Sequence, residues 1–87
     1  MVYIDDSKLP YRGMLMSHMV ADSTKELLDM AEKIHLAKIW IQHPGSTKEH
    51  FDVCQEKRSL AIKYGAVSIT QRELGLWFIK RRNMGLP

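Results

Sequence analysis

The chain has 87 residues and a net charge of +3, and its composition, 45% hydrophobic and 26% charged, excludes an intrinsically disordered protein. A chain of this length holds one core, so we expect a single domain over residues 1–87, of a size compatible with a homodimer. The lone cysteine excludes an internal disulfide. The first residues lack a signal-peptide pattern, and no apolar run approaches the roughly 20 residues of a membrane span. We therefore expect a cytoplasmic protein without a membrane partner.

Two β-prone segments precede the first predicted helix. Val2–Ile4 is a short apolar run that ends at two aspartates, which are poor strand formers. Ser7–Gly13 then has the proline and glycine of a loop. Leu15–Val20 is the second run of strand length, and in an extended chain His18 shares a face with the apolar residues two positions to either side.

The first helix has a clear start signal. Ser23 and Glu26 form a capping box, in which each side chain pairs with a backbone N–H at the helix start. Apolar residues then recur at helical spacing as far as Ile34. Asp22 precedes this cap, and because Ser23 already supplies the cap, Asp22 is available for another role.

Strands and helices continue to alternate after the first helix. Ala37–Gln42 is β-branched and aromatic and predicts a third strand, which a polar loop with a Pro-Gly turn follows. The second helix is expected to start at Asp52 and to end at Gly65, a favoured left-handed stop. Ala66–Ile69 predicts a fourth strand.

A second capping box, Thr70 with Glu73, starts the third predicted helix. Lys80, Arg81 and Arg82 complement the negative end of this helix, and residues 83–87 are expected to fray. Residues 57–87 carry a net charge of +6, whereas residues 1–56 carry −3. A basic segment of this kind is either a solvated helix face or a surface that attracts phosphate-rich partners.

The predicted order is β-β-α-β-α-β-α. Strands that alternate with helices favour βαβ units with right-handed crossovers. We therefore expect an α/β fold with a small, mostly parallel or mixed, four-stranded sheet and three helices.

Polar residues follow the predicted strands. In open α/β sheets, ligands bind beyond the carboxyl ends of the strands, and the aspartates and histidines at this edge are Asp5, Asp6, His18, Asp22, His43, His50 and Asp52. Carboxylates and imidazoles of this kind suit Mg, Mn or Zn, for which Asp5, His18 and Asp22 are the candidate ligands. They also supply general acid–base groups. Compact metal motifs and phosphate-binding glycine motifs are absent.

Each of these residues also has a purely structural interpretation. Asp5 and Asp6 can end a strand, His18 can be a core histidine, and the two loop histidines, His43 and His50, can be solvent-exposed. Asp22 and Asp52 can cap helices. Arg12 and Arg58 can clamp a phosphate or carboxylate bidentately, or pair with the aspartates.

Short motifs along most of the chain resemble one protein family. They are V-Y-I-D-D at 2–6, S-H at 17–18, A-D-S at 21–23, H-F-D at 50–52, Arg58, G-A-V at 65–67 and R-E-L at 72–74. In this order and spacing they resemble domain of unknown function 4031, a family of small bacterial and phage proteins. The resemblance implies retained residues at Asp5, His18, Asp22, His50 and Asp52, and it implies no activity. This chain departs from the family pattern by a longer loop, PGSTKE, before His50 and by a short C-terminal tail.

Two functions from different classes follow. The first is a polar pocket of Asp5, His18, Asp22, His50 and Asp52 that binds a phosphate-bearing small molecule or nucleotide and hydrolyses it, with or without a divalent metal. In it Asp5, His18 and Asp22 are the candidate catalytic residues, and Arg58 is the phosphate clamp. The second is a non-catalytic accessory protein that binds nucleic acid or a protein through the basic residues Lys80, Arg81 and Arg82.

Overall fold

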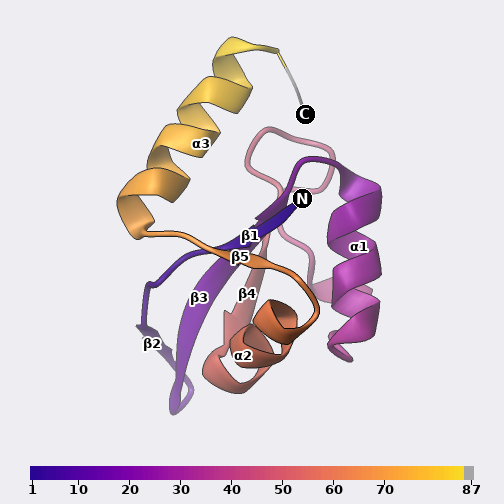
Figure 1. Cartoon of the computed structure of the whole chain (residues 1–87), viewed down its shortest axis with the longest axis vertical. Helices are drawn as coiled ribbons and strands as arrows, with labels where there is room; N and C mark the ends of the chain where they lie inside the picture. The colour runs from indigo at the N-terminus through magenta and orange to yellow at the C-terminus, as the bar shows by residue number, and fades with distance from the viewer. Residues whose placement is uncertain (86–87) are drawn as a thin grey trace.

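Strand β3 (Met14–Ala21) is the centre of the sheet in the computed structural model, which describes residues 1–85 (Figure 1). Two strands pair antiparallel with one edge of β3. Strand β1 (Val2–Ile4) pairs with the C-terminal part of β3, and strand β2 (Leu9–Tyr11) pairs with the N-terminal part of β3. Strand β4 (Phe51–Cys54) pairs antiparallel with the other edge. Strand β5 (Val67–Ser68) adds to β1 in parallel.

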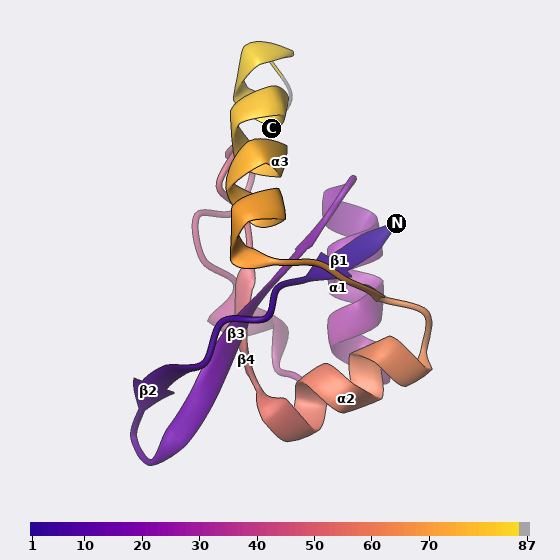
Figure 2. The ribbon, with the colours of Figure 1, turned by 60° about the vertical axis from the view of Figure 1, so that its left-hand side comes forward.

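The two faces of this sheet are covered differently (Figures 1 and 2). Helices α1 (Thr24–Lys33) and α2 (Gln55–Lys63) lie on one face. They enclose the core, whose largest fully buried apolar side chains include Ile4, Met19, Leu27, Ile34, Phe51 and Val53. Helix α3 (Gln71–Asn83) covers only one end of the other face. There its Trp77 ring packs 6.2 Å from that of Tyr3, centroid to centroid.

The α/β fold with three helices is confirmed, and the sheet is mixed. Within residues 1–85 the sheet has five strands instead of four, and of its strand pairs only β1–β5 is parallel. The added strand β2 lies in the segment that we predicted to be a loop. Within residues 1–85, no helix combines the length and the apolar character that a membrane span requires.

Two predictions in the middle of the chain were wrong. Ala37–Gln42, a predicted strand, contains the short 3-10 helix η1 (Lys38–Trp40), and Gln42 makes a single bridge with His50. Asp52, the predicted start of the second helix, lies within β4, and α2 begins three residues later. The β propensity of a segment reflects how well it fits a half-buried pleated surface, and the exposed Ile39 and Trp40 do not occupy one.

The predicted starts of the first and third helices and the predicted stop of the second helix were correct. Thr70 forms a complete capping box with Glu73. The box predicted for Ser23 and Glu26 forms in part: the Ser23 hydroxyl accepts from the Glu26 backbone N–H, but the Glu26 carboxylate accepts from the Ser23 hydroxyl instead of the Ser23 backbone N–H. Gly65, just after α2, has a φ of 104°, a backbone conformation that favours glycine. Helix α3 continues through Asn83, the first residue of the predicted frayed tail, and residues 86–87 of that tail lie outside the described part of the chain.

Candidate functional site

A buried carboxylate holds an imidazole in place on the α3 face of the sheet. Asp5 follows β1 and is 1% exposed. Its Oδ1 accepts from the backbone N–H of His18 at 2.8 Å and from the Ser7 hydroxyl at 2.7 Å. The Nδ1 atom of His18 lies 2.8 Å from the other oxygen, Oδ2. An ionised carboxylate can only accept, so Nδ1 carries the proton and Nε2 is left for other partners.

The pKa of Asp5 reflects two opposing effects. Burial alone raises it, but hydrogen bonds from the His18 backbone, the His18 ring and Ser7, together with the charge of His18, outweigh burial and hold the pKa below its ordinary value. The carboxylate therefore stays ionised at neutral pH and fixes both the tautomer and the orientation of His18.

Three hydrogen-bond acceptors, one of them a ring nitrogen of His18, lie close together on the exposed side of His18. Asp52 lies opposite His18 in the β3–β4 pairing, and its Oδ1 is 4.0 Å from His18 Nε2 and 3.4 Å from His50 Nε2. His50 donates its own Nδ1 proton to the Lys48 carbonyl at 2.8 Å. In the neutral rings both Nε2 atoms are thus acceptors. We call these two Nε2 atoms and Asp52 Oδ1 the acceptor cluster.

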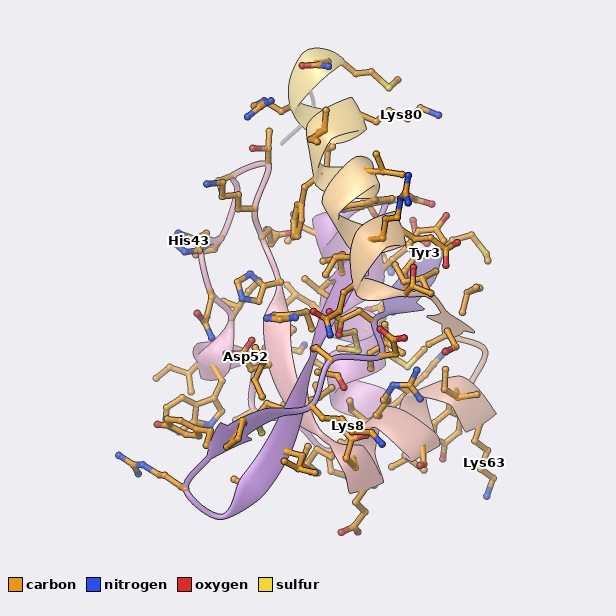
Figure 3. The ribbon with its side chains drawn as sticks, turned by 90° about the vertical axis from the view of Figure 1, so that its left-hand side faces the viewer. Tyr3, Lys8, His43, Asp52, Lys63 and Lys80 are labelled. Carbon is orange, nitrogen blue, oxygen red and sulfur yellow. The ribbon has the colours of Figure 1, made fainter. Side chains whose placement is uncertain are left out.

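The Gln42 side chain lies beside the acceptor cluster. The Gln42 side-chain amide donates to Asp52 Oδ2 at 2.6 Å, which orients this half-exposed carboxylate and leaves its Oδ1 facing the two rings. The rings of His18 and His50 are 5.7 Å apart, centroid to centroid. Figure 3 shows Asp52 and His43 on the same side of the molecule, with Lys63 on the other.

His18 separates two hollows of the surface. The larger is a groove of ≈ 550 Å³ that runs from the tip of the β2–β3 hairpin to the acceptor cluster. Its lining residues are Leu9, Pro10, Tyr11, Arg12, Met14, Met16, His18, Leu36, Trp40, Gln42 and Asp52. The smaller hollow, of ≈ 340 Å³, lies towards α3 and is lined by His18, His43, Lys48, His50, Leu74 and Phe78. Both volumes fall in the range of small-molecule sites, and the groove is the larger of the two.

A model of one protein family matches residues 2–81 of this chain. The chain belongs to the DUF4031 family. Members of this family are described as proteins of unknown function, so membership confirms the resemblance of the motifs and assigns no activity. No curated protein and no solved structure matches this DUF4031 protein.

Four of the five predicted pocket residues of the DUF4031 protein lie together: Asp5, His18, His50 and Asp52. The fifth, Asp22, lies beyond the far end of β3. Its carboxylate accepts from the Tyr3 hydroxyl at 3.3 Å and pairs with the amino group of Met1. The predicted metal ligands Asp5, His18 and Asp22 therefore do not form one set. Within residues 1–85, no group of three or more His, Cys, Asp or Glu side chains is placed to hold a metal ion.

The two predicted phosphate clamps occupy different places. Arg12 lines the outer end of the groove, with its guanidinium 5.3 Å from the centre of the Tyr11 ring. Arg58 lies elsewhere and joins three elements, because its Nε donates to the Asp5 carbonyl at 2.8 Å and its guanidinium donates to the Ser68 hydroxyl at 2.6 Å. Arg58 thus holds the backbone of Asp5 in place and does not face the groove.

The remaining predicted residues surround the site or lie apart from it. His43 is near the cluster, with its ring 6.0 Å from that of His50. Asp6 accepts from the backbone N–H of Gln71 at 2.9 Å, at the start of α3. At the other end of α3, Arg81 stacks 4.8 Å from the centre of the Trp77 ring and donates to the Asp22 carbonyl at 3.1 Å. Lys80 and Arg82 are exposed.

Three polar residues of the site were not predicted. Ser7 stands two residues after Asp5, a spacing at which a serine can bond an aspartate, so a local signal existed. Gln42 was assigned to a strand, and only the tertiary structure places it beside Asp52. Glu49, which is 6% exposed, had no signal.

Glu49 anchors the loop that carries His43 and His50. Its carboxylate accepts from the Thr24 hydroxyl at 2.9 and 3.0 Å and from the Gly45 backbone N–H at 2.8 Å. We expect Glu49→Ala to lower the free energy of unfolding by about 1–3 kcal/mol, because it leaves two donors without their acceptor. Urea denaturation measures this loss. Glu32→Ala is the control, since Glu32 is 73% exposed and should change stability little; equal effects of the two substitutions would contradict the anchoring role.

Proposed function

We propose that this protein binds a phosphate-bearing small molecule or nucleotide in the groove and hydrolyses a bond that is held beside His18. The observation that carries the proposal is the contact between buried Asp5 and His18. It leaves His18 Nε2, in its proton-accepting form, at the inner end of a groove of ligand size.

The Asp5–His18 pair has the features of a general base. A carboxylate that accepts from Nδ1 fixes the tautomer of an imidazole and stabilises the imidazolium that forms when Nε2 takes a proton. In a hydrolysis, His18 Nε2 would accept a proton from the attacking water and return it to the leaving group. His18 is 28% exposed, which gives both water and ligand access to this nitrogen.

Arg12 supports the phosphate-bearing class of ligand. Arg12 lines the outer end of the groove, and arginine is well suited to bidentate contact with phosphate oxygens. Arg12 takes the role first expected of Arg58, which already donates to Asp5 and Ser68. A divalent metal is no part of the step described.

Binding is tested by an NMR titration of the ¹⁵N-labelled protein with ribose 5-phosphate and with inorganic phosphate at millimolar concentration. We expect ribose 5-phosphate to shift the amide resonances along the groove, and we expect Arg12→Ala to weaken this binding several-fold. Arg72→Ala is the control, because Arg72 is an exposed arginine on α3. The absence of any shift in the groove, with phosphate compounds and nucleotides alike, would refute the proposal.

A second candidate function is nucleic-acid or protein binding by a non-catalytic accessory protein. The observation in its favour is that α3 extends beyond the sheet and carries the exposed residues Lys80 and Arg82 (Figures 1 and 3). A contact driven by phosphates should weaken steeply between low and moderate salt. Binding to a mixed oligonucleotide at two salt concentrations measures this, and Lys80→Ala should lower the affinity.

A further inference from the structure

Within residues 1–85, no donor is hydrogen-bonded to the three atoms of the acceptor cluster, because Gln42 donates to the other oxygen of Asp52. His18 Nδ1 is committed to Asp5 and His50 Nδ1 to the Lys48 carbonyl, so the two Nε2 atoms and Asp52 Oδ1 present only lone pairs to one another in the neutral rings. Asp52 Oδ1 lies 4.0 Å from His18 Nε2 and 3.4 Å from His50 Nε2. At these distances the acceptors repel one another unless a group with N–H or O–H donors, or a proton, lies between them.

The cluster and Arg12 lie at opposite ends of the groove. Arg12 stands at the hairpin tip, where Tyr11 pairs with Met14, whereas His18 lies four residues further along β3. At about 3.3 Å per residue, the strand from Met14 to His18 covers about 13 Å. An anionic phosphate is attracted to the guanidinium and repelled by the carboxylate of Asp52, so these two groups orient a ligand in one direction.

The surface between the two ends is apolar and aromatic. Tyr11 is 54% exposed and Trp40 is 67% exposed, on separate elements that both line the groove, and Met14 and Met16 lie between the hairpin tip and His18. Flat aromatic ligands gain from stacking on tyrosine and tryptophan rings and from contact with polarisable methionine sulfur.

From this arrangement we infer that the groove selects a nucleotide whose base carries an exocyclic amino group. The amino group donates to the acceptor cluster, the base lies against Tyr11 and Trp40, and the phosphate contacts Arg12. This selection rests on the proposed function, because it assigns a substrate class to the same groove. Bases with a carbonyl at the same position turn an acceptor towards acceptors and are disfavoured.

Two matched pairs of nucleotides test the selection. Adenosine monophosphate has an amino group where inosine monophosphate has a carbonyl, and cytidine and uridine monophosphate differ in the same way. In each pair the carbonyl member also carries a ring N–H where the amino member has a bare nitrogen, so the pair compares an outward amino donor with a donor set back in the ring. NMR titration of the full chain gives the dissociation constants and the residues that respond. We expect at least one amino member to bind about tenfold more tightly than its carbonyl partner, the difference expected for one hydrogen bond of ordinary strength.

Two substitutions locate the effect. Asp52→Asn should reduce the preference for the amino member to less than threefold, because it replaces a carboxylate by an amide that can donate as well as accept. Trp40→Ala should weaken both members of a pair without changing their ratio. Ile39→Ala is the control, since the neighbouring Ile39 is 84% exposed and does not line the groove.

The outcomes separate this inference from the proposed function. Equal binding of all four nucleotides and ribose 5-phosphate in the groove would overturn the amino selection and leave phosphate binding intact. Tight binding of Zn²⁺ alone at the cluster, with no difference between the nucleotide pairs, would also overturn it. No binding in the groove by any of these compounds would refute the proposed function and the selection together.

Discussion

Replacement of His18 by glutamine is expected to lower the hydrolysis rate constant by about 100-fold to 10,000-fold, the range that a general acid–base group contributes. The amide of glutamine cannot take up a proton at neutral pH, although it is close to imidazole in size and polarity. The rate is followed by ¹H NMR in mixtures of the protein with the phosphate compound that binds most tightly to the groove.

His35→Asn is the control for the His18 substitution. His35 is exposed, lies after α1 and has a φ of 59°, a conformation that asparagine tolerates. This variant should keep the full rate. If His18→Gln retains a tenth or more of the rate while its melting temperature is unchanged, His18 is not the general base.

Replacement of Asp5 by alanine is expected to lower the free energy of unfolding by about 2–4 kcal/mol at neutral pH. It removes the acceptor for a buried backbone N–H, for the Ser7 hydroxyl and for the His18 ring, and buried donors without partners are costly. In a domain of this size, such a loss corresponds to a fall in melting temperature on the order of 10–20 °C. Asp29→Ala, on the exposed face of α1, should have little effect.

The loss in the Asp5 variant should depend on pH. The pKa of Asp5 in the folded protein is below its ordinary value of 3.8. Its contribution is therefore fully present above that value and is lost as the pH falls through the lower pKa of the folded state. The stability difference between the wild-type protein and Asp5→Ala should therefore narrow as the pH falls below about 4. Denaturation curves between pH 5 and pH 2 measure it, and a difference that kept its full size down to pH 2 would contradict the assignment.

The starts of α1 and α3 could be predicted because their signals are local. Ser23 with Glu26 and Thr70 with Glu73 each satisfy backbone groups within one turn, so four residues contain all the information. The strand at Phe51–Cys54 could not be predicted in this way. Its backbone partners are Met16 to Met19 of β3, more than 30 positions earlier in the sequence, and pairing over such distances overrides local preference.

Four pocket residues were predicted to meet, and they do, for a different physical reason. The prediction placed them at the carboxyl ends of parallel strands. In the structure His18 lies in the middle of β3, and Asp5 and Asp52 reach it from the strand neighbours on its two sides. The same geometry excludes Asp22: it stands four residues beyond His18, and an extended chain of that length covers about 13 Å.

The amino-acid sequence by itself determined the α/β class, the starts of α1 and α3, the stop at Gly65 and the types of side chain at the site. These features depend on local hydrogen bonds, on backbone conformation and on the spacing of apolar residues. Only the tertiary structure decided the antiparallel pairing, the replacement of Asp22 by Gln42 beside the cluster, the structural use of Arg58 and the aromatic groove. Each of these depends on which distant segments share a sheet edge, and that is set by the burial of the whole core.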